Sequence, residues 1–114
     1  MNQGFTIKTN NEFQRAEMYY SVLSLINNLK LTKGEINLVA FAAVKGNISN
    51  GNVRAEYCKN YNTTESVIGN VITKLKKLSI FVKDEKKKTI VNPKIVLEFS
   101  NNIQLGINFI QSSL

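Results

Sequence analysis

Histidine is missing from this 114-residue chain, and cysteine and proline occur only once each. Histidine is the commonest general base and a frequent ligand of transition metals, so its absence removes most familiar catalytic arrangements. One cysteine and eight acidic residues also leave no zinc site of the usual ligand spacing. Phosphate-binding loops of the GxxxxGK type and dinucleotide motifs of the GxGxxG type are missing too. We therefore expect a protein that is not an enzyme and that has no metal and no cofactor.

Cys58 has no second cysteine with which to form an internal disulfide, which is typical of proteins in a reducing compartment. The apolar runs are short and interrupted, so none is long enough to span a bilayer. The first ten residues contain neither a basic leader nor an apolar stretch. These features predict a cytoplasmic protein with no membrane partner.

The positive charge of the chain is concentrated in one segment. Residues 1–114 have the length of a single domain, and 43% of them are hydrophobic, which is enough for a core. The stretch from Lys74 to Lys94 holds eight of the 15 basic residues but only two of the eight acidic ones, so it contributes +6 of the net +7. Charge gathered in this way indicates a polyanionic partner.

Apolar spacing predicts three helices in the first half of the chain. The first covers about residues 11–28. The second begins at Thr32, because Thr32 and Glu35 form the pattern of a capping box, and Gly46 is a plausible end. A turn-rich stretch follows, and then a short helix over about residues 53–60.

The segment after this short helix has the clearest pattern in the sequence. A helix is predicted over residues 63–78, with Thr63 as its cap. Its apolar positions recur at helical spacing and are Ile68, Val71, Ile72, Leu75 and Leu78. Residues 81–83 and 89–91 then flank a polar tip at residues 84–88, which predicts a β-hairpin.

Beyond Pro93 the apolar residues alternate with other residues. Ile95, Leu97 and Phe99 form one such run and Ile103, Leu105, Ile107 and Phe109 another, with Ser100 to Asn102 between them. Period two fits this region better than period 3.6, so a C-terminal β-hairpin over residues 95–110 is favoured over a final helix.

This order of elements resembles that of winged helix-turn-helix DNA-binding proteins. The closest likeness is to MarR-like regulators and to replication-initiation proteins of plasmids and phages, in which a segment similar to TESVIGNVITKLKKLSIFVKD joins recognition helix to wing. Asn92-Pro93 follows the hairpin here, as Asn-Pro often follows the wing in those families. The resemblance implies an α+β fold with a winged helix-turn-helix core at residues 11–94 and a C-terminal β extension at 95–110.

The resemblance also implies roles for individual residues. Helix 63–78 would enter the major groove of DNA, with base contacts from Thr64, Ser66, Asn70 and Thr73. The wing, residues 83–89, and the end of the helix would contact phosphates through Lys74, Lys76, Lys77, Lys86, Lys87 and Lys88. Lysine runs of this kind are also common in solvated loops, and they can discourage edge-to-edge pairing of strands.

Two functions agree with this sequence. The first is a double-stranded DNA-binding protein, either a transcriptional regulator or a replication accessory factor. The alternative is a winged-helix module used for protein–protein assembly, such as a structural component of a phage or mobile element. The apolar residues 95–110 motivate the alternative, because they could pair with another chain, including a second copy in a homodimer.

Overall fold

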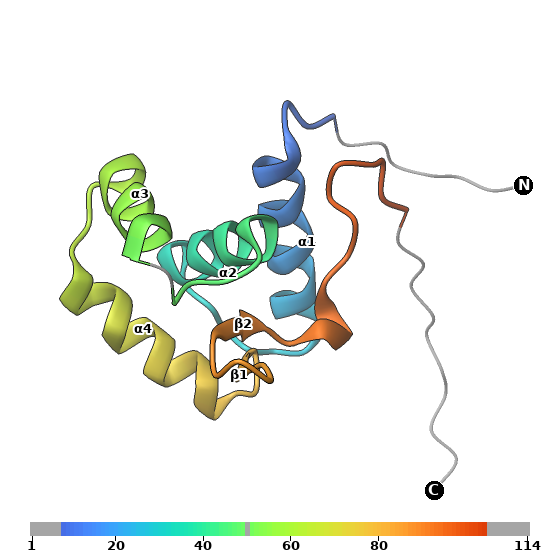
Figure 1. Cartoon of the computed structure of the whole chain (residues 1–114). Helices are drawn as coiled ribbons and strands as arrows, with labels where there is room; N and C mark the ends of the chain where they lie inside the picture. The colour runs from blue at the N-terminus through green and yellow to red at the C-terminus, as the bar shows by residue number, and fades with distance from the viewer. Residues whose placement is uncertain (1–7, 50, 105–114) are drawn as a thin grey trace, which may run out of the picture.

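The computed structural model describes residues 8–49 and 51–104, and within them the chain forms four helices and one two-stranded antiparallel sheet (Figure 1). The elements follow in the order α1 (Glu12–Ile26), α2 (Lys33–Lys45), α3 (Gly51–Tyr61), α4 (Glu65–Lys77), β1 (Phe81–Lys83), β2 (Thr89–Val91) and a 3₁₀ turn, η1 (Pro93–Ile95). The α+β class and the helical core with a hairpin, both predicted from the sequence, are confirmed.

Local side-chain chemistry sets the helix ends. The hydroxyl of Thr32 accepts a hydrogen bond from the Glu35 amide, and the Glu35 carboxylate accepts one from the Thr32 amide, so the predicted capping box is present. Helix α2 ends at Lys45 and is capped by Gly46, whose φ of 96° lies in the left-handed region. The predicted cap of α4 is wrong by one residue. Thr64, not Thr63, caps this helix, and its hydroxyl accepts from the Val67 amide at 3.4 Å.

Helix α2 lies at the centre of the molecule. Val39, Ala40 and Ala42 are fully buried, and α2 packs against α1, α3 and β2. The core cluster around α2 takes apolar side chains from every described helix and from the hairpin, among them Tyr20, Phe41, Tyr57, Ile68, Ile72, Leu75, Phe81 and Val91. The apolar face predicted for α4 is therefore the one that holds this helix to the core.

The hairpin has the predicted strands and tip. Phe81 pairs with Val91 and Lys83 with Thr89. A segment outside the sheet is hydrogen-bonded to β2, since the Ile48 amide donates to the Thr89 carbonyl at 2.9 Å and the Thr89 amide donates to the Ser49 hydroxyl. The chain between α2 and α3 thus lies along the outer side of β2, and this fixes the hairpin to the helices.

The predicted C-terminal β-hairpin is wrong over the part that the structure describes. Residues 93–95 form η1, and residues 96–104 contain no strand. We call residues 96–104 the strap, which runs beside α1 (Figure 1). Phe99 of the strap packs against Tyr20 of α1. The Tyr20 hydroxyl also donates to the Ile95 carbonyl at 2.8 Å. Ile95 and Phe99, four residues apart, face the core while Leu97 between them is exposed, so the alternation in the sequence does not correspond to a strand. Residues 105–110 lie outside the described ranges.

The left-handed conformation of Gly46 at the end of α2 can be tested by substitution. We expect Gly46→Ala to lower the free energy of unfolding by about 1 kcal/mol, because a Cβ is disfavoured at a positive φ. Gly34→Ala, near the other end of α2, is the matched control. An added Cβ there meets no atom within 4 Å, so the same substitution should raise stability by about 0.5–1 kcal/mol. Urea denaturation measures both, and changes of the same sign would contradict the argument.

Candidate nucleic-acid interface

The face of α4 opposite the core carries the predicted base-contacting residues. Ser66, Asn70 and Thr73 are exposed along the helix, and Thr64 is exposed at its cap. Their hydrogen bonds differ. The Thr64 hydroxyl caps the helix, and the Thr73 hydroxyl donates to the Gly69 carbonyl at 3.0 Å. Ser66 and Asn70 make no side-chain hydrogen bond within the described residues. Of the four predicted base-contacting residues, Ser66 and Asn70 are therefore the two whose polar side chains face solvent without a hydrogen bond in the described part of the chain.

The three lysines at the end of α4 have different environments. Lys76 and Lys77 are exposed and form no ion pair within residues 8–49 and 51–104. Lys74 instead lies against α2, where its Nζ is 2.7 Å from Oε2 of Glu35. Sequence reasoning placed Lys74 among the phosphate contacts. In the structure this lysine has an internal partner, although half of its side chain is exposed.

Glu35 joins the start of α2 to α4. Its side chain is 8% exposed, and it accepts from the Thr32 amide at 2.8 Å while it pairs with Lys74. Burial acts to raise the pKa of this carboxyl, but the hydrogen bonds from Lys74 and Thr32 outweigh burial and lower the pKa below its ordinary 4.5. The carboxylate is thus held charged between two helices, and it fixes the position of α4 relative to α2.

The tip of the hairpin is organised by Asp84. Its carboxylate accepts from the amides of Lys86 and Lys88 at 2.9 and 2.8 Å, and its carbonyl accepts from the Lys87 amide. Lys87 has a φ of 62°, as a tight turn requires. The one aspartate of the basic segment is therefore used inside the turn, while the side chains of the three lysines are exposed around it.

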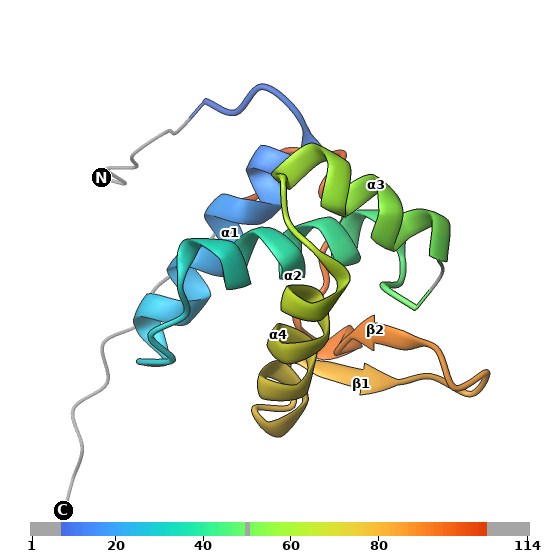
Figure 2. The same cartoon turned by 90° about the vertical axis from the view of Figure 1, so that its left-hand side faces the viewer.

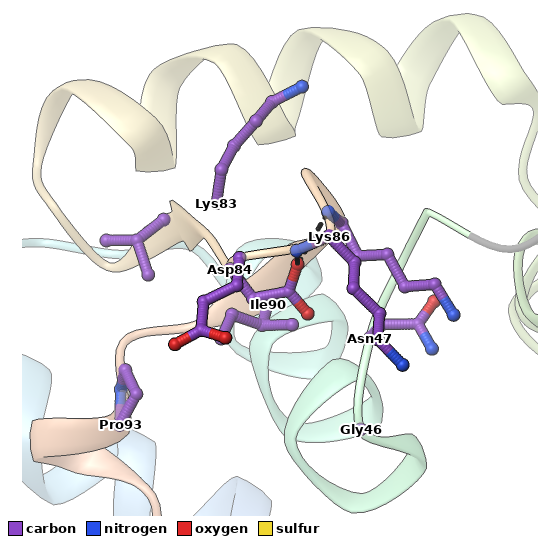
Figure 3. Close-up of a pocket in the computed structure, with 10 residues that line it drawn as sticks. Gly46, Asn47, Lys83, Asp84, Lys86, Ile90 and Pro93 are labelled. Atoms are coloured by element: carbon purple, nitrogen blue, oxygen red, sulfur yellow. Dashed lines mark hydrogen bonds between the residues drawn. The ribbon is translucent and has the colours of Figure 1, made fainter.

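Two cations that the sequence analysis did not select lie next to this surface. Lys83 ends β1 and extends toward α4, whereas Lys86 extends toward Asn47 on the other side of the hairpin (Figure 3). Strand alternation places Lys83 on the same face of β1 as the buried Phe81, so this pattern alone does not indicate an exposed cation. The position of Lys83 within the predicted wing, residues 83–89, could have selected it.

Arg54 of α3 is the second cation that was not selected from the sequence. Its Nε donates to the Ile48 carbonyl at 2.6 Å, and its guanidinium lies 3.3 Å from Glu65 in the first turn of α4. No local pattern reveals this contact, because the two partners are on different helices. Arg54 offsets the negative charge that Glu65 would otherwise bring to the exposed face.

The elements of this surface lie side by side. Helix α4 packs against β1, and Figure 2 shows α4 at the front with the hairpin projecting beside it. We define the basic face as Ser66, Asn70, Lys76, Lys77, Lys83, Lys86, Lys87 and Lys88. A shallow hollow on the hairpin, lined in part by Asn47, Lys83 and Lys86, opens next to this face (Figure 3).

Other kinds of site are not found in the described part of the chain. No group of three or more Cys, Asp or Glu residues there could hold a metal ion. No helix within residues 8–49 and 51–104 has the length and apolar character needed to cross a membrane. Comparisons with protein-family models, curated proteins and solved structures found no match.

The ion pair between α2 and α4 can be tested by removing its cation. We expect Lys74→Met to lower the free energy of unfolding by about 1–3 kcal/mol at neutral pH, because Glu35 would be left buried without its cation. Lys77→Met, at an exposed position of the same helix, should change it by less than about 0.5 kcal/mol. Equal effects of the two substitutions in thermal or urea denaturation would contradict the role given to Lys74.

The same pair predicts a pH dependence. The folded-state pKa of Glu35 is lowered, so the contribution of its charge to stability is complete above the ordinary pKa of 4.5 that it has in the unfolded chain. The contribution is lost as pH falls through the lower folded-state pKa. In Lys74→Met the lysine no longer lowers the pKa of Glu35, so the difference in stability between the wild type and this variant should be largest at neutral pH and should shrink as pH falls through the folded-state pKa of Glu35. Urea denaturation over a range of pH measures this difference, and a difference that does not change with pH would contradict the prediction.

Proposed function

We propose that this chain is a winged helix-turn-helix protein that binds double-stranded DNA through the basic face. In this assignment α2, α3 and α4 are the three core helices, α4 is the recognition helix, and the hairpin β1–β2 is the wing. The hydrogen bond from Ile48 to Thr89 supports this assignment, because it attaches the short segment between the first two core helices to the outer edge of the wing. Helix α1 and the strap, residues 96–104, are additions to this core.

The observation that carries the proposal is the arrangement of charge on two neighbouring elements. The lysines of the basic face are exposed on α4 and the hairpin, and none of them is paired within the described residues. Of the acids on α4 and the hairpin, Glu65 pairs with Arg54 and Asp84 holds the turn, while Glu85 is exposed at the hairpin tip. A convex helix beside a lysine-rich hairpin matches a DNA groove and the phosphates that flank it.

Within this surface the residues divide into two roles. Asn70 can donate to and accept from the N7 and N6 edge of adenine, and the Ser66 hydroxyl can adapt to several bases. The lysines contact phosphates, which adds affinity and position but little sequence preference. Such a protein acts as a cytoplasmic transcriptional regulator or replication accessory factor.

Replacing hairpin lysines tests the phosphate contacts. We expect Lys86→Ala combined with Lys88→Ala to weaken binding to all duplexes alike and to reduce the slope of log affinity against log salt by about 2. Lys87 is left in place because its positive φ makes it part of the turn. Fluorescence anisotropy with labelled duplexes over a range of salt measures both quantities.

The matched control for this test removes the same charge elsewhere. Lys8→Ala combined with Lys59→Ala changes two exposed lysines that lie outside the basic face. This pair should leave the salt slope nearly unchanged. Absence of salt-sensitive duplex binding in the wild type would refute the proposed function, and equal losses in the two double variants would refute the role of the hairpin.

Asn70 provides the test of base reading. We expect Asn70→Ala to reduce the difference in affinity between the preferred duplex and a scrambled duplex by about 1–3 kcal/mol, because a bidentate contact to one base is lost. The preferred duplex is first obtained by selection from a random pool. Thr73→Val is the control, since the Thr73 hydroxyl already bonds to the helix backbone. An unchanged preference in Asn70→Ala would exclude this residue from base reading.

A further inference from the structure

An exposed apolar side chain interrupts the polar face of α4. Val67 is 50% exposed, and in the sequence it stands between Ser66 and Asn70 of the basic face. It does not belong to the buried core cluster, to which α4 contributes Ile68 and its neighbours. Valine is also a poorer helix former than alanine or lysine. Neither core packing nor helix stability therefore explains a valine at this position.

The position of Val67 is fixed by contacts at the start of α4. Its amide donates to the Thr64 hydroxyl at 3.4 Å. The first turn of the helix is also held to α3, because Arg54 lies 3.3 Å from Glu65. A valine in a helix has one strongly preferred χ1 rotamer. The Val67 side chain is thus presented in a single arrangement, and little conformational entropy is lost when a ligand covers it.

Asn70 is the base-reading residue that lies next to Val67 along the helix. Residues three apart on a helix are neighbours, with Cβ atoms about 5–6 Å apart. Successive bases of one DNA strand are about 3.4 Å apart along the duplex axis. A helix that places Asn70 against one base pair therefore places Val67 within about two base pairs of it.

The major groove offers a valine one kind of partner. If α4 enters the groove, as the proposed function requires, Val67 is brought against base edges. These edges carry hydrogen-bond donors and acceptors, and the 5-methyl group of thymine is the apolar group among them. A valine that covers a donor or acceptor removes its water without replacing the hydrogen bond, which is unfavourable. Contact with a methyl group buries apolar area on both sides instead.

On the basis of the proposed function, we propose that Val67 is a specificity-determining residue that reads the 5-methyl group of a thymine. This thymine lies within about two base pairs of the adenine that Asn70 contacts. The lysines of the basic face add no such preference, because the phosphates are the same in every sequence. Duplexes in which A·T pairs stand close together at the centre of the site are therefore favoured.

Removal of single methyl groups from the DNA tests this role. Each thymine of the preferred duplex is replaced in turn by uracil, which lacks the 5-methyl group and keeps the same hydrogen-bonding edge. Fluorescence anisotropy then measures the affinity of the full chain. We expect one replacement to weaken binding of the wild type about fourfold, as for the loss of one buried methyl group. In Val67→Ala the same replacement should have no effect.

A second valine provides the matched control. Val96 is exposed and lies outside α4 and the hairpin, so Val96→Ala should keep the about fourfold effect of the replacement. Both variants should leave the slope of log affinity against log salt unchanged, because neither removes a charge. Alanine is the better helix former, so Val67→Ala keeps the fold, as circular dichroism verifies.

The outcomes separate the role of Val67 from the proposed function itself. Absence of duplex binding by the wild type overturns both. Sequence-preferring binding that no thymine-to-uracil replacement weakens overturns the role of Val67 and leaves the proposed function intact. An effect of the replacement that persists in Val67→Ala also overturns this role, because another residue then contacts the methyl group.

Discussion

The arrangement of α2 and α4 depends on the contacts that the Glu35 carboxylate makes with both helices. This carboxylate closes the capping box at the start of α2, and it binds Lys74 of α4 from a nearly buried position. Burying a carboxylate is costly, so an ion pair of this kind contributes less to net stability than its short distance suggests. Its geometric effect is larger. Alternative positions of α4 that separate Lys74 from Glu35 leave a buried charge without its cation, and they are disfavoured for that reason.

The surface of α4 follows from this constraint. Once Ile68, Ile72 and Leu75 face the core and Lys74 faces Glu35, the polar positions Ser66, Asn70, Thr73, Lys76 and Lys77 are exposed to solvent. Two acids of the region are held in structural contacts, Glu65 with Arg54 and Asp84 with the amides of the turn, whereas Glu85 is exposed at the hairpin tip. The six lysines of the basic face therefore outnumber the one acid of this region that has no contact of this kind, and the exposed face is positive.

The parts of the fold that the sequence predicts are those set by contacts between near neighbours in the chain. The capping box of Thr32 and Glu35, the glycine end of α2, the apolar period of α4 and the hairpin tip all involve residues within a few positions of one another. The pairings of Glu35 with Lys74 and of Arg54 with Glu65 join different helices, so no local pattern reveals them.

The prediction of a C-terminal β-hairpin was wrong for a related reason. The apolar alternation of residues 95–99 resembles a strand, but the position of Ile95 and Phe99 is set by the aromatic side chains of α1. Tertiary contacts therefore overrode the local period. In the candidate site, Thr64 and Thr73 were predicted from their residue type and from the polar face of the helix. Their hydroxyls are used by the helix backbone, whereas Ser66 and Asn70 are directed to solvent.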